Sequence, residues 1–197
     1  NNSVALAGKN KNLAFSDLLG TSSVLHGKKV VLFITDTLEL VKALILFDGS
    51  AKAICPISTG VSRKELYHLV SKNKFDAVIS DLNEKDLEIF SEFNIPAFKV
   101  SEMTPVEQKG IMPINQSTTW LVPTSGTTSL PKLVSHTLAT LGAASLRRKR
   151  PNEKREIWGQ FYDVTRFAGY QILLNCLLNG HKLVTSSSLD PINERVE

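Results

Sequence analysis

The sequence predicts an α/β protein with a mostly parallel sheet flanked by helices. Three observations support this fold class. Short apolar runs rich in β-branched residues alternate with longer helical patterns, the connections between them are short, and capping or stop signals fall at the joins. A chain of 197 residues with 42% hydrophobic residues is long enough for one sizeable domain or two small ones.

The first predicted unit is a strand followed by a capped helix. Residues 30–34 form a continuous apolar run, which is typical of a strand buried on both faces. Asp36 is expected to cap the next helix, with Glu39 reaching back three residues as in a capping box. Gly49 ends that helix, and residues 53–57 form the next strand.

The same unit type then repeats. Ser62 and Glu65 form a second capping-box pattern and open a helix that places apolar residues on one face. Those residues are Leu66, Leu69 and Val70. Residues 76–80 and 97–100 are predicted strands, with a helix over 84–93 between them, so the first half reads as βαβαβαβ.

Residues 101–117 change character, because Pro and Gly interrupt the periodic pattern there, and they predict a linker. We therefore expect a first βα subdomain at 1–117. Residues 118–197 are expected to hold a phosphate-loop segment and the start of a second, incomplete subdomain. That part contains predicted strands at 118–122, 157–161 and 182–186, and predicted helices at 138–146 and 165–179.

Composition excludes several classes of protein. No apolar run approaches the roughly 20 residues that a membrane-spanning helix needs, and no secretory signal is present. The two cysteines lie in apolar stretches without metal-ligand spacing, which favours reduced core thiols and a cytoplasmic location. A basic run at 147–150 is either a nucleic-acid patch or a helix C-terminus. The second interpretation is favoured, since no aromatic residues alternate with the basic ones.

A loop rich in hydroxyl groups follows the strand at 118–122. It reads Thr124-Ser125-Gly126-Thr127-Thr128-Ser129-Leu130-Pro131-Lys132. Its glycine permits close backbone approach, its hydroxyls and backbone N–H groups can donate to phosphate oxygens, and its lysine adds a mobile positive charge. A helix that begins near Ser135 could also point its N-terminus towards the loop. The spacing is not that of the GxxxxGK[ST] P-loop.

In order, spacing and context, the loop resembles the signature loop of the adenylate-forming superfamily, which includes acyl-CoA synthetases, peptide-synthetase adenylation domains and luciferases. The segment at 12–19 also resembles the entry segment of that superfamily, and the early βα units match its pattern. The superfamily usually has glycine where this chain has Ser129 and Leu133. The resemblance implies a nucleotide site formed by Thr124, Ser125, Gly126, Thr127, Thr128, Ser129 and Lys132.

The resemblance also implies a reaction. A carboxylic acid would attack the α-phosphate of ATP with Mg²⁺ present, giving an acyl-adenylate, and a thiol of CoA or of a carrier protein would then accept the acyl group. Arg166, Phe167 and Gly169 stand where the superfamily has a motif lining its acyl pocket. Arg166 either pairs with an anionic substrate group or belongs to a polar first helical turn. His136 is read as structural in preference to a general base.

Members of the superfamily carry further motifs, such as Tyr-Gly-x-Thr-Glu, that this chain lacks. Together with an initial Asn, this predicts a fragment of the large N-terminal domain that is inactive alone. The alternative is a non-catalytic module that binds a nucleotide or a partner. A receiver-like domain with Asp36 or Asp81 as phosphoacceptor is a third, disfavoured reading, because Asp36 is better explained as a helix cap.

Overall fold

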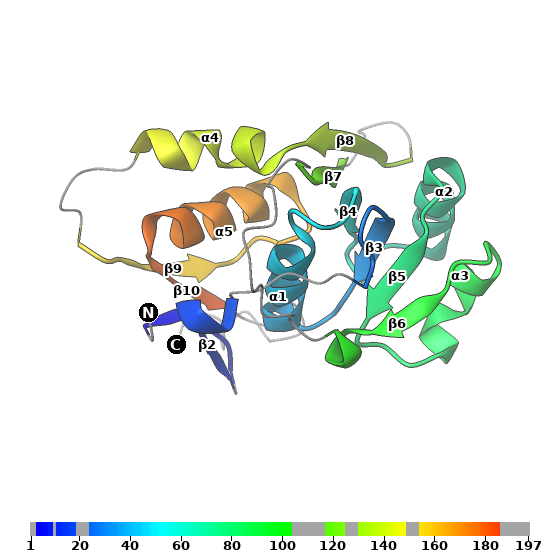
Figure 1. Cartoon of the computed structure of the whole chain (residues 1–197), viewed down its shortest axis with the longest axis horizontal. Coiled ribbons are helices and arrows are strands. Elements are labelled where there is room, and N and C mark those ends of the chain that lie inside the picture. Colours follow the sequence, from blue (N-terminus) through cyan, green and yellow to red (C-terminus); the bar gives the residue numbers. More distant parts are fainter. Residues whose placement is uncertain are drawn as a thin grey trace.

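The computed structural model describes residues 3–9, 11–18, 24–103, 117–124, 130–148 and 154–185. The fold class is confirmed: two mostly parallel sheets are flanked by helices (Figure 1). The larger sheet has six strands in the order β6-β5-β3-β4-β7-β8. In chain order these are β3 (Lys29–Phe33), β4 (Ala53–Pro56), β5 (Ala77–Ser80), β6 (Ala97–Lys99), β7 (Thr119–Thr124) and β8 (Lys132–His136).

The smaller sheet has four strands in the order β2-β1-β10-β9 and joins the two ends of the described chain. Its strands are β1 (Val4–Ala7), β2 (Asn12–Ala14), β9 (Ile157–Gln160) and β10 (Lys182–Thr185). Leu6 of β1 lies opposite Leu183 of β10 in parallel register, and β10 is parallel to β9. The sheet therefore depends on pairing between segments more than 170 residues apart in the sequence.

Three longer helices cover the sheets, and a fourth packs on one of them. They are α1 (Thr37–Phe47), α2 (Arg63–Asn73), α5 (Phe167–Asn179) and α4 (Leu138–Arg148), which lies against α5. Gly180 ends α5 in the left-handed conformation with φ 75°, as its place after an apolar helix predicted. The shorter helices are η1 (Phe15–Leu18), η2 (Lys85–Leu87), α3 (Glu88–Ser91) and η3 (Val100–Glu102).

Two helices differ from the prediction in length or starting point. The helix expected over 84–93 is a 3-10 turn, η2, followed by the single-turn helix α3. The helix expected near Ser135 does not begin there, because Ser135 lies within strand β8 and α4 begins only at Leu138. Thr137 caps α4 instead, with its Oγ1 accepting from the backbone N–H of Thr140 at 3.1 Å. A strand, not a helix N-terminus, therefore follows the candidate phosphate loop.

The capping predictions had different outcomes at the two helices. Asp36 accepts from the backbone N–H groups of Leu38 and Glu39 at 2.8 and 3.0 Å, so the cap of α1 is confirmed. Glu39 does not reach back, and this half of the predicted box was wrong. Its carboxylate pairs with Lys11 at 2.8 Å and Lys42 at 3.3 Å, because two cations compete successfully for it. Both halves of the box at the start of α2 are present.

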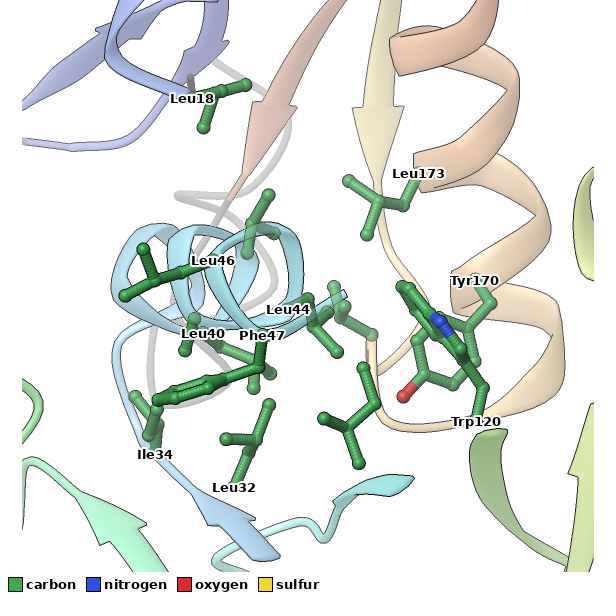
Figure 2. Close-up of a cluster of buried hydrophobic side chains, with 14 of the residues drawn as sticks. Leu18, Leu32, Ile34, Leu40, Leu44, Leu46, Phe47, Trp120, Tyr170 and Leu173 are labelled. Carbon is green, nitrogen blue, oxygen red and sulfur yellow. The ribbon is translucent and has the colours of Figure 1, made fainter. Parts of the chain in front are cut away.

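Alternating side chains of the six-stranded sheet enter two hydrophobic clusters. Val31 and Cys55 point to the side of α2 and α3, whereas Leu32 and Ile54 point to the side of α1 and α5. The cluster on the side of α1 and α5 also contains Leu183 of the smaller sheet. Figure 2 shows the side chains of α1 packing between the strand residue Leu32 and the α5 residues Tyr170 and Leu173. One core therefore joins both sheets through α1 and α5.

Both cysteines are buried and free, in agreement with the prediction of core thiols. Burial raises the pKa of Cys176 to about 12. Helix α4 ends at Arg148, so the first part of the basic run closes a helix. Within the described ranges, no helix is long and apolar enough to cross a bilayer, and no group of three or more acidic, His or Cys side chains is arranged to hold a metal ion.

Replacing Asp48 with asparagine is expected to stabilise the protein by about 0.5 kcal/mol at pH 7. The gain in stability is small because part of the Asp48 carboxylate remains in contact with water. Asp48 follows the last turn of α1 and accepts from Trp120 Nε1 at 2.9 Å. Burial raises the pKa of Asp48 despite that bond, so its charged form opposes folding. An asparagine keeps the acceptor and removes a negative charge from a helix C-terminus.

The sign of this effect fixes its pH dependence. The folded state holds the Asp48 proton more tightly than the unfolded chain, so stability falls as pH rises above the ordinary value of 3.8. The advantage of Asp48→Asn should therefore shrink as the pH is lowered towards that value. Urea unfolding at several pH values measures it, and a variant that is less stable at pH 7 would contradict the assignment.

Candidate functional site

The candidate phosphate loop connects the two strands of an antiparallel hairpin. Thr124 ends β7, Lys132 begins β8, and the two residues lie opposite each other in the register. The Oγ1 of Thr124 donates to the backbone carbonyl of Lys132 at 3.1 Å and closes the base of the loop. The other five predicted nucleotide-binding residues lie outside the described part of the chain. They are Ser125, Gly126, Thr127, Thr128 and Ser129.

The hairpin register fixes the face on which Lys132 lies. Lys132 and Thr124 are on the same face as Trp120 and Val122, since residues alternate along a strand. That face packs on α1 and α5. Lys132 is exposed and makes no ion pair with any residue that the structure describes, so its ammonium group is available to an anion.

Leu133 has a structural role that explains why the position suits an apolar residue. It lies opposite Pro123 in the hairpin, on the other face of the sheet from Lys132. Its partly buried side chain packs against the cluster beneath α2. Leu133 is thus a strand residue rather than a loop residue, and its departure from the superfamily's glycine falls outside the turn itself.

The predicted acyl-pocket residues lie at the start of α5. Arg166 occupies the N-cap position without a capping bond from its side chain. Phe167 is half exposed, and its ring lies 5.9 Å from that of His136. Gly169 is buried against the backbone of Asp163: a Cβ at Gly169 would lie only 2.1 Å from the Asp163 carbonyl oxygen. Its role in the fold is to permit this close approach.

The hairpin also separates His136 from the candidate phosphate loop. His136 lies opposite Trp120 in the hairpin. Along the strands, this pair is four residues away from the pair formed by Thr124 and Lys132. Four residues of antiparallel strand span about 14 Å. No acidic partner for His136 occurs among the described residues, and its ring lies against that of Phe167. These contacts agree with a structural rather than a general-base role.

Two hollows open at the carboxyl ends of the parallel strands, which is where α/β folds commonly bind ligands. One has a volume of about 210 Å³ and lies between the end of β3, the end of β4 and the segment after β9. The other has a volume of about 650 Å³ and lies on the α2 side, with Phe33, Leu66 and Ile89 among its walls. Of the predicted site residues that the structure describes, none lines either hollow.

Sequence reasoning missed the polar residues Thr35, Ser58 and Thr59, which lie around the smaller hollow. A signal was present, because polar residues directly follow three predicted strands, and parallel strands end at one edge. The receiver-like reading loses its support here. Asp81 accepts from the backbone N–H groups of Thr35 and Asp36 at 2.9 Å, and Asp36 caps α1, so both carboxylates serve the backbone.

No protein-family model matches the chain, and no curated protein matches it in sequence. Solved structures do match in fold. The N-terminal subdomain of NpsA from Klebsiella oxytoca, in complex with 3-hydroxyanthranilyl-AMSN, aligns with a TM-score of 0.75 at 19% identity, over 99% of this chain and 52% of its own.

Two further structures show the same similarity. The o-succinylbenzoate CoA synthetase MenE from Bacillus subtilis, in complex with the acyl-adenylate intermediate OSB-AMP, aligns with a TM-score of 0.73 at 16% identity, over 96% of this chain and 53% of its own. A luciferase-like enzyme from the mealworm Zophobas morio aligns with a TM-score of 0.73 at 18% identity, over 98% and 52%. The chain spans about half the length of these neighbours.

Proposed function

We propose that this chain, which has the fold of the N-terminal part of adenylate-forming enzymes, supplies part of the ATP site of a ligase that activates a carboxylic acid as its acyl-adenylate. The observation that carries the proposal is the hairpin that holds a Ser/Thr/Gly loop between Thr124 and Lys132. The loop resembles the signature loop of the adenylate-forming superfamily. Two solved structures with this fold contain 3-hydroxyanthranilyl-AMSN and the acyl-adenylate OSB-AMP, respectively.

The described residues at the base of the loop suit an anion. Lys132 is exposed and free of ion pairs with described residues, while Thr124 keeps the two strands joined through its bond to the Lys132 carbonyl. In the proposal, Ser125, Gly126, Thr127, Thr128 and Ser129 donate backbone and hydroxyl hydrogen bonds to the phosphates of ATP or AMP. Lys132 offsets the charge that develops on the leaving pyrophosphate.

The remaining partners follow from the same proposal. Mg²⁺ would neutralise phosphate charge when bound with ATP. Arg166, Phe167 and Gly169 would contribute to one wall of the carboxylic acid's pocket, with Arg166 available because its side chain does not cap α5. A thiol of CoA or of a carrier protein would accept the acyl group. We place the protein in the cytoplasm. The boundary at residue 117 is a division of the sequence, since β7 and β8 belong to the same sheet as β3 to β6.

Replacing Lys132 with alanine is expected to weaken binding of Mg-ATP and AMP by about 10-fold or more, since a charge-assisted hydrogen bond contributes about 1.5–3 kcal/mol. Isothermal titration calorimetry, with thermal stabilisation as a second readout, measures the change. Lys72→Ala, at an exposed lysine in the last turn of α2, is the matched control and should bind like wild type. Equal nucleotide affinity in Lys132→Ala and wild type would remove Lys132 from the site.

The chain alone is expected to give no ATP–pyrophosphate exchange with any carboxylic acid. It spans about half of its structural neighbours, and its 197 residues contain no Tyr-Gly-x-Thr-Glu motif. Exchange above the background of a no-acid reaction would show that the chain is catalytic by itself. Nucleotide binding without exchange, in a longer protein that includes this chain, would favour a non-catalytic binding module over a ligase.

A further inference from the structure

Helix α2 has an exposed basic side that faces away from the core. The apolar residues of the helix enter the hydrophobic cluster beneath it. Figure 1 shows α2 at the end of the molecule opposite to the smaller sheet. The outward side of α2 and of its C-cap is here named the α2 face, and its exposed members are Arg63, Lys64, Tyr67, Ser71 and Lys74.

An aromatic ring lies at the centre of the α2 face. Tyr67 is 50% exposed, which leaves a large apolar surface in water. Arg63 and Lys64 precede it by one helical turn and Lys74 follows it by about two turns, so cations lie on both sides of the ring. The ring packs against that of the partly buried Phe93, with centroids 5.0 Å apart. Tyr67 is therefore held in place before any partner arrives.

The positive charge of the α2 face is largely free. Arg63 pairs with Glu92 at 2.7 Å. Lys64 and Lys74 make no ion pair within the part of the chain that the structure describes. At a rise of 1.5 Å per residue, the two lysines lie about 15 Å apart along the helix axis. Two free ammonium groups on either side of an apolar ring favour a partner that carries separated negative charges around an apolar group.

The composition of the α2 face favours a protein as this partner. A fixed aromatic ring beside an arginine, with charged groups at the periphery, is typical of protein interfaces. A nucleic acid is disfavoured, because the Arg63 guanidinium is already paired and Phe93 is too buried to stack on a base. We propose that the α2 face binds an acidic segment of another protein, whose carboxylates pair with Lys64 and Lys74 while an apolar side chain packs on Tyr67. This proposal does not depend on the ligase function.

The test is a titration of the isotope-labelled chain, followed by the backbone amide NMR signals of α2. The probe is an Ala-rich helical peptide with glutamates on both sides of a single Leu. It should give saturable shifts confined to α2 and the segment around Phe93. The same peptide with Gln in place of Leu should bind about 5-fold more weakly, since it buries less apolar surface. A peptide with lysines in place of the glutamates should not bind, because like charges repel.

Variants of the chain separate the two contributions. Lys64→Gln/Lys74→Gln should weaken binding of the acidic peptide about 5-fold. In Tyr67→Ala, the peptides with Leu and with Gln should bind equally, because the ring that distinguishes them is gone. The matched control Lys28→Gln/Lys52→Gln changes two exposed lysines outside the α2 face and should bind like wild type.

The wild-type titrations decide even where a variant does not fold. An absence of saturable shifts with the acidic peptide would overturn the proposal. So would equal binding of a single-stranded oligothymidylate of the same charge, since the α2 face would then be a general polyanion surface.

Discussion

The variant Gly169→Ala is expected to lose about 3 kcal/mol of folding free energy, because an added methyl group there meets rigid backbone. Its Cβ would lie 2.1 Å from the carbonyl oxygen and 2.6 Å from the carbonyl carbon of Asp163. The backbone of Arg166 already donates to that carbonyl at 3.0 Å, so the segment cannot move away without breaking the first turn of α5. Thermal and urea unfolding measure the loss, expected as a fall in Tm of roughly 10 °C.

Gly142→Ala is the matched control. A Cβ at Gly142, within α4, would meet only the Cδ1 of Leu178 at 2.8 Å, the mobile end of a flexible side chain. Alanine also favours the helix over glycine by about 1 kcal/mol, so the two effects should nearly cancel. A Gly169→Ala protein as stable as wild type, with altered ligand binding only, would show that Gly169 acts through a ligand rather than through packing.

Tyr170 is expected to respond in opposite directions to two substitutions. Tyr170→Ala should destabilise the protein by about 4 kcal/mol, the usual cost of removing a fully buried aromatic side chain. Its ring is 0% exposed and meets Trp120 edge to face, with centroids 5.6 Å apart. Because Trp120 belongs to the larger sheet and α5 also contacts both strands β9 and β10, this contact helps to join the two sheets.

Tyr170→Phe should instead stabilise the protein by about 1 kcal/mol, since the buried hydroxyl has no hydrogen-bond partner among the described residues. Burial raises the pKa of Tyr170 well above 10, so the unfolded chain ionises first at alkaline pH. Stability is then lost as pH rises above 10, and the advantage of Tyr170→Phe should grow there. Urea unfolding at pH 7 and pH 10.5 tests both variants. A destabilised Tyr170→Phe would reveal a partner for the hydroxyl.

Local signals in the sequence were reliable where neighbouring residues decide the structure. Ser62 and Glu65 form both halves of their capping box, and Gly180 ends α5 at the predicted place, because each motif involves residues within a few positions. Strand β3 was predicted from its apolar run, since burial on both faces removes the need for alternation. The single helix predicted over 84–93 is divided into η2 and α3 in the structure, a division that the local sequence pattern did not indicate.

The candidate site shows the same division. The loop motif and its position after a strand were readable from the sequence, because Thr124, Gly126 and Lys132 all lie within one stretch of nine residues. Strand β8 was not, because the pattern of residues 132–136 is mostly polar and only pairing with β7 makes it a strand. The convergence of Thr35, Thr59 and Asp163 on one hollow was also hidden, since it depends on three connections folding to one edge.

The sequence by itself determined the α/β class, the N-caps Asp36 and Ser62, the apolar strands and the loop motif with its glycine and lysine, all of which depend on short-range chemistry. Only the tertiary structure decided that β1 pairs with β10, that two sheets share one core through α1 and α5, and that Leu133 packs beneath the hairpin. The physical reason is that periodicity reports which face of a segment is buried, whereas the partner that buries it is chosen by contacts between distant parts of the chain.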